Sequence, residues 1–510
     1  MKINKFILSI VAAALITACS LTEEPPFLSK DNIFENLSNA RNGLDGVYMG
    51  LNAWDNFSYS THVLYEGYSG LYTYRHYNQG VNYVQNTTLF ALRPDANAKE
   101  VEGVWKSHYT TISRANDIIS AITPINNPVT NDDKGMNDVL GQAYFIRAFE
   151  YFDLVRLWGD VPLRLEPMNT SNIHKPKSTA KEIYTQILQD VEMAKQLMLP
   201  KSDQLTGYAA KEAANMLLAK IYMTLATSDA SLQDNSPQEY WQMAYDEAIQ
   251  VYGKYRLVPN YASLWDEATG NNTSESIFEV QYSEVAGSGM PRLYTPHGAT
   301  KGNNTWGRIY INAEVYDDQA AVYPDDPRIS STFISEYLNV VQNTVKRSYP
   351  SVPRTSYYNA YPYAYKYWAK NVNLLGITNN RNFVIYRYAD LLLMLSEISN
   401  ELQNNEQIKY VEEVLSRVSL PLQPEYEGGQ DSFREAIMKE YRYELLGELQ
   451  TVFNEKRRGY DWFKSHVIDK HNNYEKWDAE IDILQEDDPE LVMYLPIPSS
   501  EINTNQEINN

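Results

Sequence analysis

The sequence predicts a mainly α-helical protein, in which a spine of paired helices carries long loops and small β elements. Apolar residues recur at steps of three and four over several long segments, which is the period of an amphipathic helix. Residues 57–97 and 270–380 instead show little helical period and are rich in Asn, Gly, Ser, Thr, Pro and Tyr. We expect these two segments to form long loops, whose aromatic content argues against disorder.

The clearest helical stripe consists of Leu140, Tyr144, Ala148, Tyr151, Val155 and Trp158. Gly159 and Pro162 follow it, and they predict its end, because glycine favours a left-handed cap and proline cannot continue a helix. Similar stripes predict helices from Ser178 to Pro200, from Ala210 to Leu225, from Trp241 to Tyr255, from Tyr388 to Leu402 and from Phe433 to about Gly447.

Two shorter patterns refine this fold. Ala214 and Ala248 lie 34 residues apart, which is the tetratricopeptide period, and small residues let paired helices approach closely. Residues 277–282 alternate in polarity as a strand does, so we expect small sheets among the loops.

The first residues are typical of a secretory signal. Lys2 and Lys5 precede an apolar run at residues 6–16, which is too short to span a bilayer, and small residues follow before Cys19. We therefore interpret residues 1–18 as a signal peptide. Residues 19–30 contain two adjacent prolines and several polar residues, and they predict an extended tether.

Cys19 is the only cysteine in the chain, and residues 16–19 resemble the bacterial lipobox. An unpaired thiol is a liability in an oxidising compartment unless chemistry consumes it, so we expect Cys19 to be lipidated. Acyl chains would then be the sole membrane anchor. The alternative is an ordinary signal peptide with an incidental cysteine.

The net charge of the chain limits the classes of partner that it can bind. The formal net charge is -21, and it becomes -23 once Lys2 and Lys5 leave with the signal peptide. So acidic a surface repels phosphate backbones, and we therefore expect no nucleic-acid partner.

The sequence contains no motif that points to catalysis. It lacks a phosphate-binding glycine loop, an HExxH motif and a G-x-S-x-G elbow, and its seven histidines are scattered. Asp317–Asp318 and Asp325–Asp326 could serve as a glycosidase pair or bind structural calcium, but we expect solvated loop carboxylates. We therefore expect no enzyme activity and no cofactor.

Aromatic residues in the loops are the positive signal for saccharide binding, because sugar C–H faces stack on rings while Asn, Asp and Arg bind hydroxyls. These residues gather in two loops, whose candidates are given below, and in a third run at residues 357–368. Packing of loops on the spine, or a protein-binding surface, would use the same residue types. The candidate ligand-binding residues are Tyr72, Tyr74, Arg75, Tyr77 and Tyr83 in the first loop, and Asn304, Trp306, Arg308 and Tyr310 in the second.

Five strings resemble the SusD/RagB family of Bacteroidetes nutrient-uptake lipoproteins, and they occur in family order. They are VWKSHY at 104–109, RAFEYFDLVRLWGDVPL at 147–163, RYADLLLM at 387–394, EYRYELLGE at 440–448 and LPIPSSEI at 495–502. The chain departs from the family pattern at residues 414–421 and near its C-terminus, which indicates a divergent subgroup. The matching strings, including Arg147 and Asp153, are interpreted as structural.

This resemblance implies a SusD-like fold with four tetratricopeptide-like helix pairs. It divides the mature chain into an N-terminal helical part at residues 31–270 and a C-terminal part at residues 271–510 packed on the same scaffold. It also implies a lipoprotein on the outside of the outer membrane, which captures oligosaccharides and delivers them to a SusC-like TonB-dependent transporter. Capture of peptides by the same architecture, and a surface glycoside hydrolase, are the alternatives.

Overall fold

The computed structural model describes residue 34 and residues 36–74, 81–125, 133–356, 359–375, 379–475 and 483–509. These residues form a mainly helical fold with small sheets, as the sequence predicts. The expected signal peptide, Cys19 and the tether lie outside the described residues. Within the described part of the chain, no helix is both long and apolar enough to cross a membrane.

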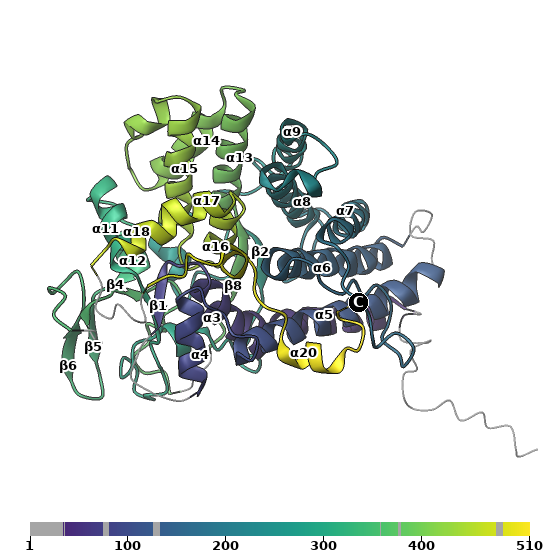
Figure 1. Ribbon diagram of the computed structural model, residues 1–510, viewed down its shortest axis with the longest axis horizontal. Coiled ribbons are helices and arrows are strands. Elements are labelled where there is room, and N and C mark those ends of the chain that lie inside the picture. The colour runs from purple at the N-terminus through teal and green to yellow at the C-terminus, as the bar shows by residue number, and fades with distance from the viewer. Residues whose placement is uncertain are drawn as a thin grey trace, which may run out of the picture.

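Four helix pairs form the scaffold. They are α2 (Leu37–Leu51) with α5 (Lys99–Ile125), α6 (Lys134–Trp158) with α7 (Ala180–Leu197), α8 (Lys211–Thr227) with α9 (Pro237–Ala248), and α13 (Tyr388–Leu402) with α14 (Gln407–Arg417). Successive pairs contact each other through α5 and α6, α7 and α8, and α9 and α13, so the pairs stack into a curved spine (Figure 1). The predicted tetratricopeptide-like scaffold is confirmed.

Local signals begin and end these helices where the sequence indicates. Gly159, with a φ of 70°, ends α6, and a capping box at Thr179 begins α7. Ala214 and Ala248 lie on the two helices of one pair, so their 34-residue spacing is not a repeat period here.

The helix predicted from Trp241 to Tyr255 is shorter than expected. It ends at Ala248, yet Val251 and Tyr255 remain buried in the turns that follow. These two residues face the core without being helical, which explains why the apolar period continues beyond the helix.

The prediction of a long loop over residues 57–97 was wrong. This segment contains the end of the π-helix η1 (Trp54–Ser58) and all of α3 (Ser60–Gly67) and α4 (Val81–Phe90). Every residue of α3 is buried, including His62 and Glu66. A helix buried on all sides has no polar face, so no helical period marks it in the sequence.

The described part of the chain contains three small antiparallel sheets, of which two lie on the side of the molecule away from α6–α9 and one lies at the centre, next to α8 (Figure 1). The first has the order β1 (Tyr72–Tyr74), β3 (Ile309–Ile311), β7 (Tyr363–Ala364) and β4 (Phe333–Ile334). The second joins β2 (Ser276–Val280) to β8 (Phe383–Arg387), and the third joins β5 (Glu336–Asn339) to β6 (Thr344–Arg347). Strand β2 confirms the strand predicted near residues 277–282.

Further helices lie outside the four pairs. They are α10 (Met290–Tyr294), α11 (Ala313–Val322), α12 (Ile329–Thr332), α15 (Gln430–Leu445), α16 (Thr451–Lys456), α17 (Tyr460–Phe463), the π-helix η6 (Lys464–Ile468), α18 (Asp469–Asn472), α19 (Pro489–Met493) and α20 (Ser499–Thr504). One hydrophobic cluster includes buried residues from Phe34 to Leu495. This cluster includes residues from both sides of residue 270, so the predicted division there stays a prediction.

A buried charge network ties the C-terminal strings together. Arg387 donates to Glu275, Glu444 and Glu448 at 2.6 to 2.8 Å. Arg147 makes two 2.7 Å hydrogen bonds to Asp190 in the N-terminal part. These side chains are buried and bonded within the protein, in agreement with a structural role for the strings that contain them.

Candidate functional site

The candidate binding surface is a group of aromatic and arginine residues, which we call the ring cluster. It is built by η1 and the residue after it, by the end of β1, by α10 and by the loop that leads into β3. Its members are Trp54, Tyr59, Tyr74, Arg292, Trp306 and Arg308.

The rings of the cluster are packed against one another. Trp54 stacks on Tyr59 with centroids 4.6 Å apart and an interplanar angle of 11°. The Tyr59 and Trp306 rings lie 5.7 Å apart and nearly perpendicular, at 88°. Tyr59 is buried, whereas Trp54 and Trp306 are half-buried, so the two indoles carry the accessible part.

Backbone contacts hold the loop around Trp306 in place. The Trp306 amide donates to the Arg292 carbonyl at 2.7 Å, and the Arg308 amide donates to the Leu293 carbonyl at 3.0 Å. Gly307 between them has a φ of +49°, and a Cβ there would lie 2.7 Å from Pro296. Glycine is therefore required for this close approach, which fixes Trp306 and Arg308 relative to α10.

Two guanidinium groups lie over the Trp306 ring. The Cζ atoms of Arg292 and Arg308 lie 3.9 Å and 4.1 Å from its centroid. Arg308 also donates to the Tyr74 hydroxyl at 3.4 Å. Burial lowers the pKa of Arg292 from its usual value, and the neighbouring Arg308 adds to this effect. A ligand would thus meet guanidinium donors beside an indole, rather than a bare ring.

Burial disfavours negative charge on the inner side of the cluster. Burial raises the pKa of the Tyr59 hydroxyl well above its usual value, and it raises the pKa of the Glu100 carboxyl that interacts with Tyr59 and Tyr74. The two arginines therefore dominate the local charge, although the whole chain is strongly acidic.

Comparison with known protein families identifies the fold. The sequence profile described as "SusD family" matches residues 220–510, and the profile described as "Starch-binding associating with outer membrane" matches residues 34–223. The chain belongs to the SusD family.

Individual relatives agree with this assignment. SusD-like protein P2 of Formosa agariphila is 27% identical over 80% of this chain and 79% of its own length. The solved structure of a SusD homolog from Bacteroides thetaiotaomicron has a TM-score of 0.77 at 20% identity, covering 94% of this chain and 97% of the homolog. Surface glycan-binding protein A from the same organism, in complex with laminarihexaose, has a TM-score of 0.71 at 19% identity, covering 92% and 98% of the two chains.

Three candidate residues of this SusD-family chain, Tyr72, Tyr74 and Tyr310, lie in strands and not in loops. Tyr72 is in β1 and is 1% exposed, and Tyr310 is in β3 and is 2% exposed. The Tyr310 hydroxyl donates to that of Tyr363 at 3.1 Å. Strand pairing turns the rings of Tyr72 and Tyr310 into the protein, so neither offers a ring face to a ligand, and we leave both out of the ring cluster.

The remaining candidates are distributed differently. Trp306, Arg308 and Tyr74 meet in the ring cluster, and Tyr74 contributes its hydroxyl from a buried ring. Asn304 is exposed and donates to the Leu375 carbonyl at 3.4 Å. Arg75, Tyr77 and the side chain of Tyr83 lie outside the described residues. Ligand contact by any of these residues stays a prediction.

Three members of the cluster, Trp54, Tyr59 and Arg292, were not among the residues predicted from the sequence. Trp54 and Arg292 stand in no aromatic run, and Tyr59 lies outside the group of tyrosines from which the candidates came. The one signal in the sequence was Gly307 between Trp306 and Arg308, because glycine often marks a place where another segment approaches the backbone closely. That signal does not indicate which distant residues lie against them.

The third ring-rich run is divided between core and surface. Tyr361, Tyr363 and Tyr367 are buried, whereas Tyr365 and Trp368 are half-buried and meet edge to face at 5.5 Å. The described part of this run therefore contributes mainly to packing, which was one of the three interpretations open from the sequence.

The acidic pairs are engaged with neighbouring side chains. Asp317 accepts hydrogen bonds from the hydroxyls of Tyr349 and Tyr474, and Asp318 accepts one from Tyr443 at 2.7 Å. Asp326 is buried and pairs with Arg328, whereas Asp325 is exposed. The described residues contain no group of three His, Cys, Asp or Glu side chains that could hold a metal ion, so we propose no calcium site at these aspartates.

Proposed function

We propose that this protein binds oligosaccharide nutrients at the cell surface through the ring cluster, and passes them to a SusC-like TonB-dependent transporter. The observation that carries the proposal is the half-buried Trp306, which lies beside the guanidinium groups of Arg292 and Arg308 on a SusD-family scaffold. Indole presents an apolar surface to sugar C–H groups, and guanidinium presents donors to hydroxyl and carboxylate oxygens.

The comparisons support this choice of ligand class. One of the two matching profiles is described as starch-binding, and a structural neighbour was solved with laminarihexaose bound. The positive charge of the ring cluster favours ligands rich in acceptor oxygens, so both neutral and uronate-containing glycans suit it. Peptide capture is the second candidate that the aromatic residues allow, and a binding assay separates the two.

We propose that the protein performs no covalent chemistry on its ligand. A glycosidase needs two carboxyl groups on either side of the scissile bond, with one of them protonated. Three of the four candidate aspartates instead accept hydrogen bonds from tyrosines or pair with arginine. Incubation of purified protein with the bound glycan should release no reducing sugar, and measurable release would contradict this part of the proposal.

The anchor and the transporter partner rest on the sequence and on the family. Lipid on Cys19 would hold the protein to the outer membrane, with the helical fold outside the cell. Mass spectrometry of the native protein should find cleavage before Cys19 and an acylated N-terminus. Extraction in mild detergent should co-purify a large β-barrel transporter, and repeated isolation as a lone chain would contradict the partnership.

The binding step is tested with purified protein on a glycan array, followed by calorimetry with the best glycan. Replacement of Trp306 by alanine should weaken binding at least tenfold, which is about 1.4 kcal/mol. Tyr494→Ala is the matched control, because Tyr494 is 42% exposed and lies outside the ring cluster. Unchanged affinity in Trp306→Ala would remove the ring cluster from the site, and binding to unfolded polypeptide alone would favour peptide capture.

A further inference from the structure

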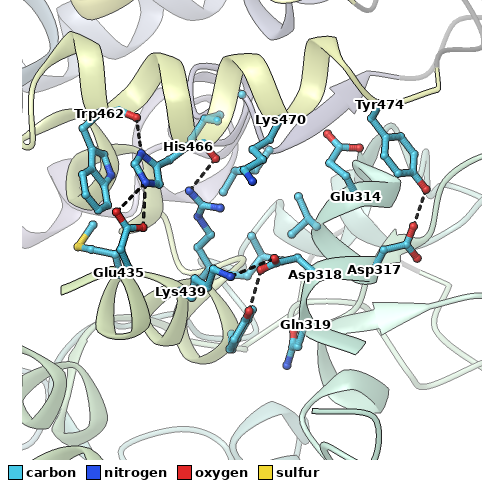
Figure 2. Close-up of a pocket in the computed structure, with 18 residues that line it drawn as sticks. Glu314, Asp317, Asp318, Gln319, Glu435, Lys439, Trp462, His466, Lys470 and Tyr474 are labelled. Carbon is cyan, nitrogen blue, oxygen red and sulfur yellow. Dashed lines mark hydrogen bonds and ion pairs between the residues drawn. The ribbon is translucent and has the colours of Figure 1, made fainter. Parts of the chain in front are cut away.

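A cavity apart from the ring cluster lies between α11, α15 and the segment from Tyr460 to Tyr474, and we call it the clamp pocket (Figure 2). Its volume is about 350 Å³, near the lower end of the range for small-ligand pockets, which is about 300 to 1,000 Å³. Its lining shares no residue with the ring cluster. Figure 2 shows polar side chains from all three elements around one central space.

One wall of the clamp pocket is shaped by a π-helix. Residues Lys464–Ile468 form η6, which follows α17 directly. π-Helical turns are rare and occur often at functional sites. Here the turn stacks the His466 ring on the Trp462 ring, with centroids 3.7 Å apart and planes 10° from parallel.

The Trp462–His466 stack is fixed by further contacts. Trp462 donates its indole N–H to Glu455 at 3.2 Å, and His466 Nε2 lies 2.9 Å from a Glu435 carboxylate oxygen on α15. Trp462 remains half-buried, so the aromatic wall is rigid but accessible. Rigid aromatic walls bind ligands with little loss of side-chain entropy.

The opposite wall carries carboxylates whose positions are set by neighbours. Glu314 accepts from His471 Nδ1 at 2.5 Å, and Asp317 accepts from the Tyr474 hydroxyl at 2.5 Å. Asp318 lies 3.6 Å from the Lys439 ammonium group. A carboxylate has about four lone-pair sites, so each retains acceptor capacity for a ligand hydroxyl.

The charge around the clamp pocket discriminates between ligand classes. Four carboxylates line it, and they outnumber the ammonium groups of Lys439 and Lys470. Arg442, which also lines the pocket, is neutralised by Glu455 at 2.5 Å. This arrangement repels anions and offers acceptors and donors to hydroxyl groups. The apolar part of the lining includes Met438, Leu446 and Val467, which suit the C–H face of a sugar ring.

We propose that the clamp pocket is a second saccharide site, which takes a short neutral saccharide and excludes uronates. It rests on the proposed function only in taking a saccharide as its ligand, and it differs in place and in charge from the ring cluster. The ring cluster places two guanidinium groups beside its indole, whereas the clamp pocket places carboxylates there.

A tryptophan reporter exists in each site, so one experiment tests both. The protein is prepared with 5-fluorotryptophan, and its ¹⁹F resonances are assigned by Trp462→Phe and Trp306→Phe. The probes are glucose, galactose, mannose, xylose, N-acetylglucosamine and laminarihexaose, with glucuronic acid as the anionic counterpart of glucose. We expect the Trp462 resonance to shift in a saturable manner with at least one neutral probe, and not with glucuronic acid.

Variants then connect that shift to the clamp pocket. Glu314→Gln removes the negative charge and replaces one acceptor oxygen by an amide donor. Lys470→Ala removes an exposed donor without disturbing the core, so at least one variant should fold. Each should weaken the binding reported by Trp462 severalfold and leave the Trp306 resonance unchanged. Glu475→Gln, on an exposed residue beside the pocket, is the matched control and should have no effect.

The outcomes separate the two proposals. A Trp306 response without any Trp462 response would overturn the clamp pocket and leave the proposed function intact. A Trp462 response equal for glucose and glucuronic acid would overturn the neutral-ligand assignment. No response at either reporter would overturn both proposals, and a Trp462 response alone would support the clamp pocket while contradicting the ring cluster.

Discussion

The ring cluster and the clamp pocket are built from similar parts but carry opposite charge. Each combines an accessible indole with polar side chains, and each includes a π-helix, η1 in one and η6 in the other. Arginines surround Trp306, whereas carboxylates line the cavity beside Trp462. The comparison teaches that aromatic content alone does not specify a ligand, because the neighbouring charges decide which sugars are admitted.

The two regions also differ in how the protein holds them. The ring cluster depends on a loop pinned to α10 and on the positive φ of Gly307. The clamp pocket is formed by helices that side-chain pairs hold together, among them His466 with Glu435 and His471 with Glu314. We therefore expect the clamp pocket to keep its shape through side-chain electrostatics, and the ring cluster through backbone geometry.

The largest effect should come from a substitution that destabilises the whole fold and so disrupts the ring cluster and the clamp pocket together. Arg387 is 2% exposed and forms ion pairs with three buried glutamates. Arg387→Met leaves their charges uncompensated and should destabilise the fold by about 3 to 5 kcal/mol. Denaturant unfolding measures this, and binding at both sites should fail near the lowered transition. Arg347→Met, at an exposed ion pair, is the control and should change stability by less than about 0.5 kcal/mol. A small effect of Arg387→Met would show that the two regions do not share a common support.

Raising the pH should loosen the α3–β1 unit, which adjoins Tyr59 and Tyr74 of the ring cluster. Burial raises the pKa of Glu66 from 4.5 to about 8. Stability from this group is complete below the unfolded pKa, and it is lost as pH rises through the folded pKa near 8, because only the folded state retains the proton. Wild-type stability should therefore fall between about pH 5 and pH 8, and Glu66→Gln should flatten that dependence.

Thermal unfolding across this pH range checks the Glu66 prediction, and hydrogen exchange locates the change. After correction for the intrinsic pH dependence of amide exchange, protection should fall with rising pH in residues 60–74 of the wild-type protein and stay nearly constant there in Glu66→Gln. A loss of protection confined to residues 460–474 would assign the pH sensitivity to the clamp pocket instead.

A smaller effect is expected from the arginines of the ring cluster. Arg308→Met removes a guanidinium group that lies over Trp306 and donates to Tyr74. Loss of a charge-assisted hydrogen bond, about 1.5 to 3 kcal/mol, should weaken binding of a uronate-containing glycan roughly ten- to a hundredfold. Calorimetry with acidic and neutral glycans measures this, and equal losses for both classes would mean that charge does not control selection there.

Salt should give the smallest and most selective effect. Raising ionic strength from about 0.1 M to about 1 M shortens the Debye length from about 10 Å to about 3 Å. Uronate binding at the ring cluster should then weaken by a factor on the order of three, while neutral saccharide binding at the clamp pocket should change little. Equal salt dependence in the two reporter resonances would remove the electrostatic contrast between the regions.

Sequence patterns predicted the scaffold better than the site. The stripe from Leu140 to Trp158 and the cap at Gly159 correspond closely to α6, because amphipathic period and capping are local properties. Helix α3 was missed, because burial on all sides leaves no period to detect. Composition identified Trp306 and Arg308 as candidates, yet it also selected Tyr72 and Tyr310, whose strands turn their rings inward.

The sequence by itself determined the helical pairs and the family, because period, caps and short motifs are written in neighbouring residues. It also predicts a lipid anchor at Cys19. Only the tertiary structure decided which rings reach solvent and which charges surround them. Trp54 joins Trp306 through Tyr59, and Glu314 faces Glu435 across the clamp pocket, although each pair lies more than a hundred residues apart. Such neighbours follow from the packing of whole helices and sheets, which no local pattern encodes.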